Sequence, residues 1–188
     1  DGIRQPVGMH GFRLEVEAHI ITASASTTEN LRKCVSMAGI EVSQFVLSPL
    51  ASAEAVLSET ERTMGAAVVD LGGGTTDLAI YLNGDVWYTN VINIGSNYIT
   101  TDIAQGLRLP VDVAEEVKLH HGYAVLDDIS EEESFNVVPF SAEESTKVLR
   151  RDLVNIIEAR AEEILSLVHQ EIKRSGVSGL LPAGLILT

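Results

Sequence analysis

Residues 66–77 read AAVVDLGGGTTD, and this run organises the segment around it. Its first five residues, Ala66–Asp70, are almost wholly apolar, which is typical of a strand that is buried on both faces. The three glycines predict a turn, after which Thr76–Leu82 returns as a second strand. Asn83-Gly84 is a strong hairpin signal, and Asp85–Ile94 follows it as a third strand. The sequence therefore predicts a three-stranded meander whose first turn is a glycine loop.

The residues after the meander predict helices with short extended pieces between them. A helix is expected to begin at Ser96, and a capping box of Asp112 and Glu115 predicts another, to about His121. A long amphipathic helix follows and ends at Gly176. Its apolar stripe holds Leu149, Leu153, Ile156, Ile157, Ile164, Val168 and Ile172, and extended pieces are expected at 123–126, 134–138 and 184–188.

The residues before the meander predict two more strands and two more helices. Strands are expected over 12–22 and 40–47, and helices from Ser26 to Gly39 and from Ser48-Pro49 to about Arg62. A capping box of Ser26 and Glu29 opens the first helix. Cys34 lies on the apolar stripe of that helix, so we expect it to be buried. Strands and helices in this order indicate an α/β architecture with at least two subdomains.

The composition excludes several classes of protein. With 188 residues, 45% of them hydrophobic, and a mean hydropathy of +0.17, the chain is not disordered as a whole. A single cysteine excludes an internal disulfide. No apolar run is long enough to span a bilayer, and a net charge of −14 argues against nucleic acid as a partner. The first residues lack Met and a signal-peptide pattern, so we expect a fragment of a longer protein.

The glycine loop carries the chemistry of the sequence. Gly72, Gly73 and Gly74 can adopt positive φ and expose backbone N–H groups, which form an anion-binding concavity, and Thr75 adds a hydroxyl donor. Asp70, at the end of the preceding strand, would repel a bare phosphate unless a divalent cation or its water shell lay between them. This arrangement predicts a site for a Mg²⁺-bound nucleotide. The alternative, from turn chemistry alone, is a tight hairpin that needs glycine.

The run Val69–Asp77 resembles the second phosphate-binding motif of the superfamily that contains actin, heat-shock chaperones and hexokinase. Within that superfamily, the surrounding sequence is similar to the FtsA family of bacterial cell-division proteins. The likeness covers essentially the whole chain, and the matching segments are Pro49–Leu57, Glu59–Gly65, Ala114–Lys118 with Gly122, Ile157–Arg160 and Gly184–Thr188. It implies a partial actin-like (ribonuclease H-like) ATPase fold, with part of a small inserted subdomain at the N-terminus.

The resemblance implies roles for individual residues. Asp70 would orient Mg²⁺ and water, and the cradle of the β- and γ-phosphates would be Gly72, Gly73, Gly74 and Thr75. Glu115 and Lys118 match a pattern that the superfamily lays against adenosine; a surface ion pair is the alternative. Gly95 and Ser96 would open a helix near the phosphates. ATP and Mg²⁺ are thus the expected ligands, and this fragment alone is expected to bind ATP weakly or not at all.

The resemblance also implies subdomains and partners. Residues 1–26 would end the inserted subdomain, 27–64 would belong to the first large subdomain, 65–96 and 182–188 to the second large subdomain, and 97–181 to its smaller companion. That last subdomain would receive the acidic C-terminal tail of FtsZ at basic positions of the long helix, namely Lys147, Arg150, Arg151 and, above all, Arg160. Ordinary solvated helix charge is the alternative.

One departure from the family pattern concerns catalysis. Hydrolytic relatives often place Gln or Glu before the proline-alanine helix, and this chain has Ser48 there. The implied function is an ATP-binding adaptor with weak or absent hydrolysis, which polymerises at the membrane and tethers the FtsZ ring. It would lie in the cytoplasm, peripheral to the inner face of the bacterial membrane at the division site, and sequence outside this chain would contact the membrane. The alternatives are an FtsA-like type IV pilus assembly protein and a phosphotransferase or chaperone ATPase of the same superfamily.

Overall fold

A computed structural model describes residues 7–16, 18–140 and 144–188. The chain forms two compact units, one up to Ser43 and the other from Gln44. In the first unit, helix α1 spans Ala25–Met37, and the other described residues form neither helix nor strand. Gly39, with a φ of 78°, follows the end of α1 as predicted. The expected subdomain of residues 1–26 is described only in part. The assignment of residues to the four expected subdomains stays a prediction.

Several expectations about the first part of the chain are wrong. No strand forms over residues 12–16, 18–22 or 40–47, because a strand needs a neighbouring strand for its backbone ladder, and neither of the two described sheets includes any of these residues. Helix α1 begins after Ser24, whose side chain makes no capping hydrogen bond, and not at Ser26. Cys34 is exposed, since α1 buries none of its residues.

The second unit is built on a four-stranded sheet with the order β3-β2-β1-β6. Strands β1 (Ala66–Leu71), β2 (Thr76–Leu82) and β3 (Asp85–Ile92) form the predicted antiparallel meander. The hairpin between β2 and β3 takes the positive φ values that the Asn-Gly pair predicts, 55° and 88°. Strand β6 (Leu185–Leu187) runs parallel to β1. The glycine loop therefore joins two central strands of this sheet.

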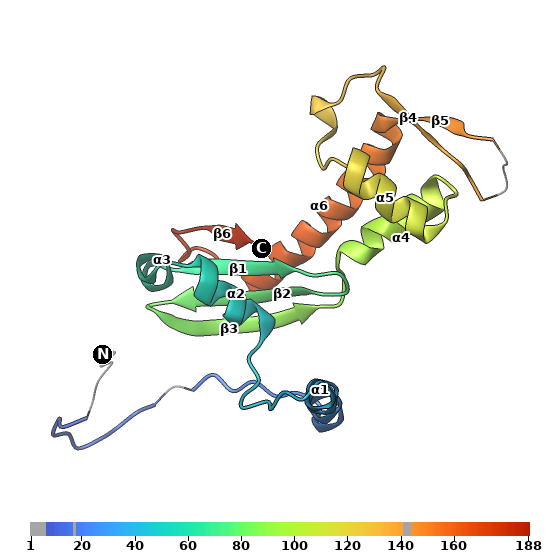
Figure 1. The fold of residues 1–188 in the computed structure, drawn as a ribbon. Coiled ribbons are helices and arrows are strands. Elements are labelled where there is room, and N and C mark those ends of the chain that lie inside the picture. The colour runs from blue at the N-terminus through green and yellow to red at the C-terminus, as the bar shows by residue number, and fades with distance from the viewer. Residues whose placement is uncertain (1–6, 17, 141–143) are drawn as a thin grey trace. The chain divides into compact units, whose positions relative to one another are not determined.

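Helices cover both faces of the sheet (Figure 1). Helix α2 (Ser48–Val56) packs Ala53 against Val68 and Ala79 on one face. The C-terminal half of α6 (Arg150–Arg174) packs Val168 against the other face. The single helix expected from Ser48 to Arg62 is wrong: a capping box of Ser58 and Glu61 starts a separate helix, α3 (Glu59–Met64).

A second core joins α4 (Ser96–Gly106), α5 (Val111–His121), a two-stranded sheet of β4 (Ser134–Val137) and β5 (Thr146–Leu149), and the N-terminal half of α6. Residues 123–125 are not extended strand, and a short 3-10 turn, Leu126–Asp128, follows them. The N-cap of α5 is Pro110, so the expected capping box of Asp112 and Glu115 is wrong; Glu115 turns toward α4 instead. Within the part of the chain that the structure describes, no helix combines the length and the apolar composition needed to cross a bilayer.

Candidate functional site

The glycine loop presents free hydrogen-bond donors at the surface. Gly72 N–H donates to the carbonyl oxygen of Thr75 at 2.9 Å, which closes the turn between β1 and β2. The N–H groups of Gly73, Gly74 and Thr75 have no acceptor among residues 7–16, 18–140 and 144–188, and Gly73 and Gly74 are exposed. Successive free N–H groups in one turn are typical of an anion-binding concavity.

The three glycines do not use the conformational freedom that their sequence led us to expect. None of them has a positive φ. A Cβ at Gly72 would lie 3.2 Å from the carbonyl oxygen of Thr75, and one at Gly73 would lie 3.3 Å from the side chain of Asn97. At Gly74, no atom lies within 4 Å of that position. Close neighbours therefore explain why glycine is favoured at positions 72 and 73, whereas the space beside the backbone of Gly74 is open.

Helix α4 begins directly against the loop. The N–H groups of Ser96 and Asn97 donate to the carbonyl oxygens of Gly72 and Gly73, each at 2.9 Å. A Cβ at Gly95 would lie 2.5 Å from both of those oxygens, so only glycine permits this approach. The structure thus brings Gly95 and Ser96 to the loop, where the first N–H groups of α4 hold its carbonyl groups.

Asp70 lies beside the loop at the end of β1, where two hydroxyl groups meet two carboxylates. Ser52 Oγ, on α2, donates to Asp70 Oδ2 at 2.8 Å. Asp77 is the direct cross-strand partner of Asp70, and Thr75 Oγ1 donates to Asp77 Oδ2 at 3.4 Å. Burial raises the pKa of Asp77, the bond from Thr75 opposes that rise, and the charge of Asp70 adds to it.

The donor set fits a Mg²⁺-bound polyphosphate better than a metal held by protein alone. Among the described residues, no three His, Cys, Asp or Glu side chains form a metal-binding group. Mg²⁺ usually takes one or two carboxylates and completes its shell with water and phosphate oxygens. Asp70, with the free N–H groups of Gly73 and Gly74 next to it, can supply the protein part of such a site.

Glu115 and Lys118 form the ion pair that sequence reasoning held as the alternative to an adenosine contact. Lys118 Nζ lies 2.7 Å from Glu115 Oε2 and donates to Thr100 Oγ1 at 2.8 Å. The buried Thr100 hydroxyl in turn donates to Glu115 Oε2. Hydrogen bonds from Lys118 and Thr100 hold the pKa of Glu115 below its ordinary value. The three side chains join α4 to α5, and the adenosine contact stays a prediction.

The arginines expected to bind a partner already have acidic neighbours. Arg160 pairs with Asp102 and Glu163, and its guanidinium lies over the ring of Tyr98, 5.6 Å from its centroid. Arg150 pairs with Glu133 and Arg151 pairs with Glu131.

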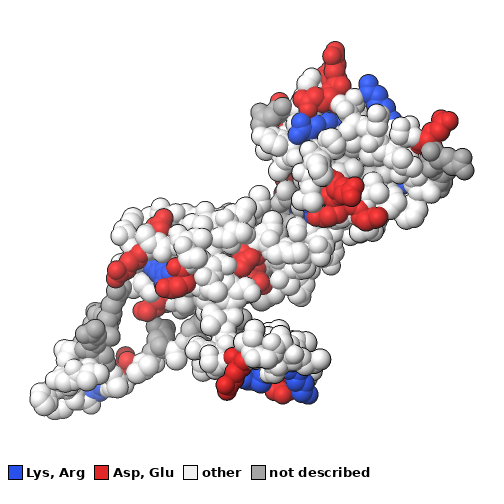
Figure 2. Space-filling view, viewed as in Figure 1, with Lys and Arg blue, Asp and Glu red and all other residues white. Residues whose placement is uncertain are grey.

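Lys147 is exposed on β5 and pairs with no acid in the described part of the chain. In Figure 2, basic and acidic atoms lie next to one another in the region of β4 and β5. Arg150 and Arg151 lie at the start of α6 with Lys147, and Arg160 lies about 14 Å along the helix, at 1.5 Å per residue. The structure therefore places the three arginines on α6 and Lys147 on β5, the strand directly before it, and the four positions do not form one cluster.

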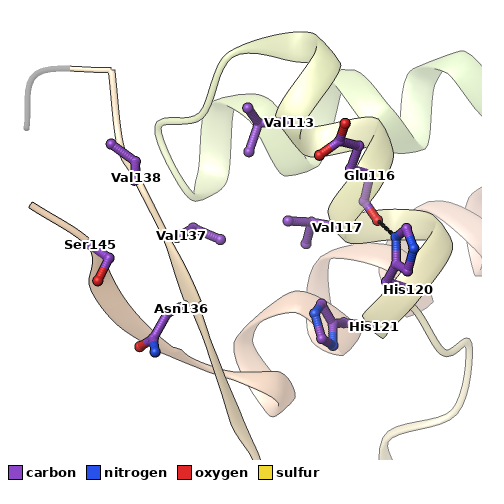
Figure 3. A pocket seen from close by; sticks show the side chains of 9 residues that line it. All are labelled: Val113, Glu116, Val117, His120, His121, Asn136, Val137, Val138 and Ser145. Atoms are coloured by element: carbon purple, nitrogen blue, oxygen red, sulfur yellow. Dashed lines mark hydrogen bonds between the residues drawn. The ribbon is translucent and has the colours of Figure 1, made fainter.

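A pocket of about 310 Å³ lies between α5 and the β4–β5 sheet. Val113, Val117 and Val137 face it, together with His120 and His121 (Figure 3). The ring of His121 stacks on Phe135 with 4.4 Å between centroids. Burial lowers the pKa of His121, and so do the charges of His120 and Arg150. None of the residues of the glycine loop lines this pocket.

Sequence reasoning missed several residues of the site. These residues are Ser52, Asn97, Thr100 and Asp102. The side-chain hydrogen bonds of Ser52, Thr100 and Asp102 join residues that lie 15 to 58 positions apart in the sequence. Ser52 lies in the family-like segment Pro49–Leu57, but sequence reasoning assigned it no role, and no motif marks Asp102. Their contacts form only when α2 packs on β1 and α4 packs on α6. The position of Thr100, four residues into α4 and facing α5, was open to prediction only from helix periodicity.

Comparison with solved structures identifies the fold. MreB5 of Spiroplasma citri, solved with ADP, superposes with a TM-score of 0.73 at 22% identity, over 88% of this chain and 54% of that chain. The ethanolamine utilization protein EutJ from Carboxydothermus hydrogenoformans superposes with a TM-score of 0.56 at 22% identity, over 81% of this chain and 44% of that chain. The chain therefore has an α/β fold of the actin-like ATPase type, and it corresponds to about half of each of these structures.

Comparison with curated sequences identifies the family. The chain is 42% identical, over its whole length, to the cell division protein FtsA of Neisseria meningitidis, and 43% identical to that of Bacillus subtilis. It covers 45% and 42% of those two proteins, so it spans less than half of their length. The family model described as cell division protein FtsA matches residues 67–182, which include the glycine loop, α4, α5 and α6. The chain therefore belongs to the FtsA family of cell division proteins.

Proposed function

We propose that this chain forms part of an actin-like, ATP-binding cell-division protein, and that its glycine loop holds the nucleotide. Gly72, Gly73, Gly74 and Thr75 would contact the β- and γ-phosphates, and Asp70 would hold Mg²⁺ through water. The free N–H groups of the loop carry this proposal. MreB5, a structural neighbour, was solved both with ADP and with AMPPNP, which supports a nucleotide ligand for this fold.

Charge favours a metal-bound nucleotide over a free phosphate at this loop. The N–H dipoles attract an anion, whereas the carboxylates of Asp70 and Asp77 repel it. A divalent cation reverses that repulsion, because it binds both a carboxylate and phosphate oxygens. The same two carboxylates thus weaken binding without Mg²⁺ and strengthen it with Mg²⁺.

Other residues have supporting roles in this proposal. Ser96 donates its N–H group to a carbonyl oxygen of the loop, and Gly95 permits the close approach of α4 to the loop. Glu115 and Lys118 lie on the helix that would face adenosine. ATP hydrolysis is weak or absent, because Ser48, at the start of α2, offers no carboxylate to activate water.

In the cell, the protein would polymerise beneath the membrane and tether the FtsZ ring, peripheral to the inner face at the division site. Lys147, Arg150, Arg151 and Arg160 would receive the acidic C-terminal tail of FtsZ. An acidic peptide there competes with the acids that now pair with the arginines, so the affinity would depend strongly on salt. The expected subdomain ranges form part of this proposal.

Substitution of Gly74 tests the nucleotide site without disturbing the fold. A Cβ at Gly74 meets no atom within 4 Å, and the residue has no positive φ, so Gly74→Ala should leave the thermal unfolding midpoint unchanged. It should weaken MgATP binding by about tenfold or more, because the methyl group stands where phosphate must approach the backbone. Calorimetric titration of the full-length protein with MgATP measures this effect.

The matched control is Gly179→Ala, which also meets no atom within 4 Å and lies far along the chain from the loop. It should change neither stability nor affinity. Wild-type affinity for MgATP in the Gly74→Ala variant would contradict the proposed site.

A further inference from the structure

Ser52 and Asp70 are joined across the interface between α2 and β1. The Ser52 hydroxyl donates to Asp70 Oδ2 at 2.8 Å, and both residues are half-buried. The other carboxylate oxygen, Oδ1, accepts no hydrogen bond from any described residue. One oxygen of Asp70 is therefore held by the protein, and the other is available to a ligand.

The element that carries Ser52 is fixed in place. Ala53, the next residue of α2, is 0% exposed and packs against Val68 and Ala79 of the sheet. Val68 and Asp70 are two residues apart in β1, so their side chains lie on the same face of the sheet. The packing of α2 on this face therefore also brings Ser52 to Asp70. A hydroxyl group on a well-packed helix orients its acceptor more accurately than one on a loop.

The Asp70 carboxylate that accepts this hydrogen bond has a like-charged neighbour. Asp77 lies directly opposite Asp70, and two like charges in this cross-strand position repel one another. Each carboxylate has its own hydroxyl donor, Ser52 for Asp70 and Thr75 for Asp77. Without the bond from Ser52, the Asp70 carboxylate is free to rotate away from Asp77.

We propose that Ser52 is a positioning residue, whose hydroxyl fixes the Asp70 carboxylate so that its free oxygen receives the water shell of the cation that accompanies the nucleotide. This inference rests on the proposed nucleotide site and adds a residue to it. Residues that orient a metal-binding carboxylate from behind commonly change metal affinity when they are removed. Ser52 should therefore affect the Mg²⁺ dependence of nucleotide binding and not the binding of nucleotide alone.

The test compares four variants of the full-length protein: Ser52→Ala, Ser52→Thr, Asp70→Asn and Ser166→Ala. Ser166 is an exposed serine on α6 and serves as the matched control. ATP affinity is measured over a series of Mg²⁺ concentrations and in EDTA, with the thermal midpoint recorded for each variant. Ser52→Ala should raise the Mg²⁺ concentration for half-maximal binding by about tenfold. It should leave the affinity in EDTA and the thermal midpoint unchanged, and Ser52→Thr should restore the wild-type Mg²⁺ dependence because threonine keeps the hydroxyl.

The outcomes separate this inference from the proposed function. If Asp70→Asn weakens MgATP binding and Ser52→Ala does not change the Mg²⁺ dependence, the role of Ser52 is refuted and the site stands. If Asp70→Asn binds MgATP as the wild type does, the proposed site itself is refuted. If Ser52→Ala lowers affinity equally in Mg²⁺ and in EDTA, with a lower thermal midpoint, Ser52 is a structural residue and the inference is refuted.

Discussion

Arg160 on α6 donates two hydrogen bonds to the carboxylate of Asp102 on α4, from Nε to Oδ2 at 2.6 Å and from Nη2 to Oδ1 at 3.0 Å. The side chains are 21% and 26% exposed, so water screens this pair less than it screens a surface pair. The hydrogen bonds from Arg160 to Asp102 raise the pKa of Arg160. This bidentate contact joins two helices of the second core and occupies a residue that we expected to bind a partner.

Removal of this contact should loosen the packing of α4 against α6. Arg160→Gln should lower the free energy of unfolding by about 1 to 2 kcal/mol, because a charged hydrogen-bond pair is lost and Asp102 is left without its main partner. The double variant Arg160→Gln with Asp102→Asn should be little worse than the single one. Chemical denaturation of the four proteins of this cycle measures the coupling, and additive losses would show that the two side chains act independently.

The basic positions in the N-terminal half of α6 should bind an acidic peptide in a salt-dependent way. Arg151→Glu and Arg160→Glu should each weaken binding of a fluorescent FtsZ tail peptide by roughly tenfold at low salt, because attraction is replaced by repulsion. Lys173→Glu is the matched control, since it makes the same charge change on an exposed residue near the other end of α6. Equal binding by the wild type and the first two variants would refute the proposal that these residues bind the peptide.

Gly95 should tolerate no side chain. A Cβ there would lie 2.5 Å from the carbonyl oxygens of Gly72 and Gly73, and backbone atoms cannot give way as a flexible side chain can. Gly95→Ala should destabilise the protein by about 1 to 3 kcal/mol and displace the loop from α4. Thermal unfolding and MgATP titration measure both effects. Gly179→Ala, which adds a methyl group in open space, is the control; a Gly95→Ala variant that matches it in both assays would contradict the loop–helix packing.

Glu171 should make stability depend on acidic pH. This residue is 7% exposed, and its carboxylate accepts hydrogen bonds from Tyr88 at 2.9 Å and Asn90 at 2.6 Å. Burial pushes the pKa of Glu171 upward, but the bonds from Tyr88 and Asn90 and the charge of Arg174 outweigh it and hold the pKa below its ordinary value. The stability that this group supplies is present above the unfolded-state pKa and is lost as the pH falls through the folded-state pKa.

The matching variant is Glu171→Gln, which should cost about 1 to 3 kcal/mol at pH 7. The difference from the wild type should shrink as the pH falls below the ordinary pKa of a glutamate side chain, because the wild-type carboxylate is then progressively protonated. Urea denaturation at several pH values measures this. A constant difference over that range would show that the charge of Glu171 contributes nothing to stability.

The central meander could be predicted from sequence because its signals are local. The apolar run of β1, the glycine loop and the Asn83-Gly84 hairpin each specify structure within a few residues, and all three lie where they were expected. The long helix α6 was also predictable, since the spacing of Leu153, Ile157, Ile164 and Val168 matches its buried face.

Some elements that depend on distant partners could not be predicted, although β6, which pairs with β1, lies where an extended piece was expected. The alternation over residues 12–22 favours a strand, but neither described sheet includes residues 12–16 or 18–22. Strand β5 has no apolar alternation of its own and forms by pairing with β4. In the same way, the sequence marked Asp70 by its place before the glycines, whereas Ser52 becomes part of the site only through the packing of α2.

Helix α6 belongs to both cores of the second unit. Leu153 and Ile157 lie in the core with α4 and α5, and Val168 lies beneath the sheet. The helix has 25 residues and is about 37 Å long at 1.5 Å per residue. Because this one helix contributes side chains to both cores, a substitution that shifts α6 against α4 and α5 should also disturb its packing on the strands that carry the glycine loop.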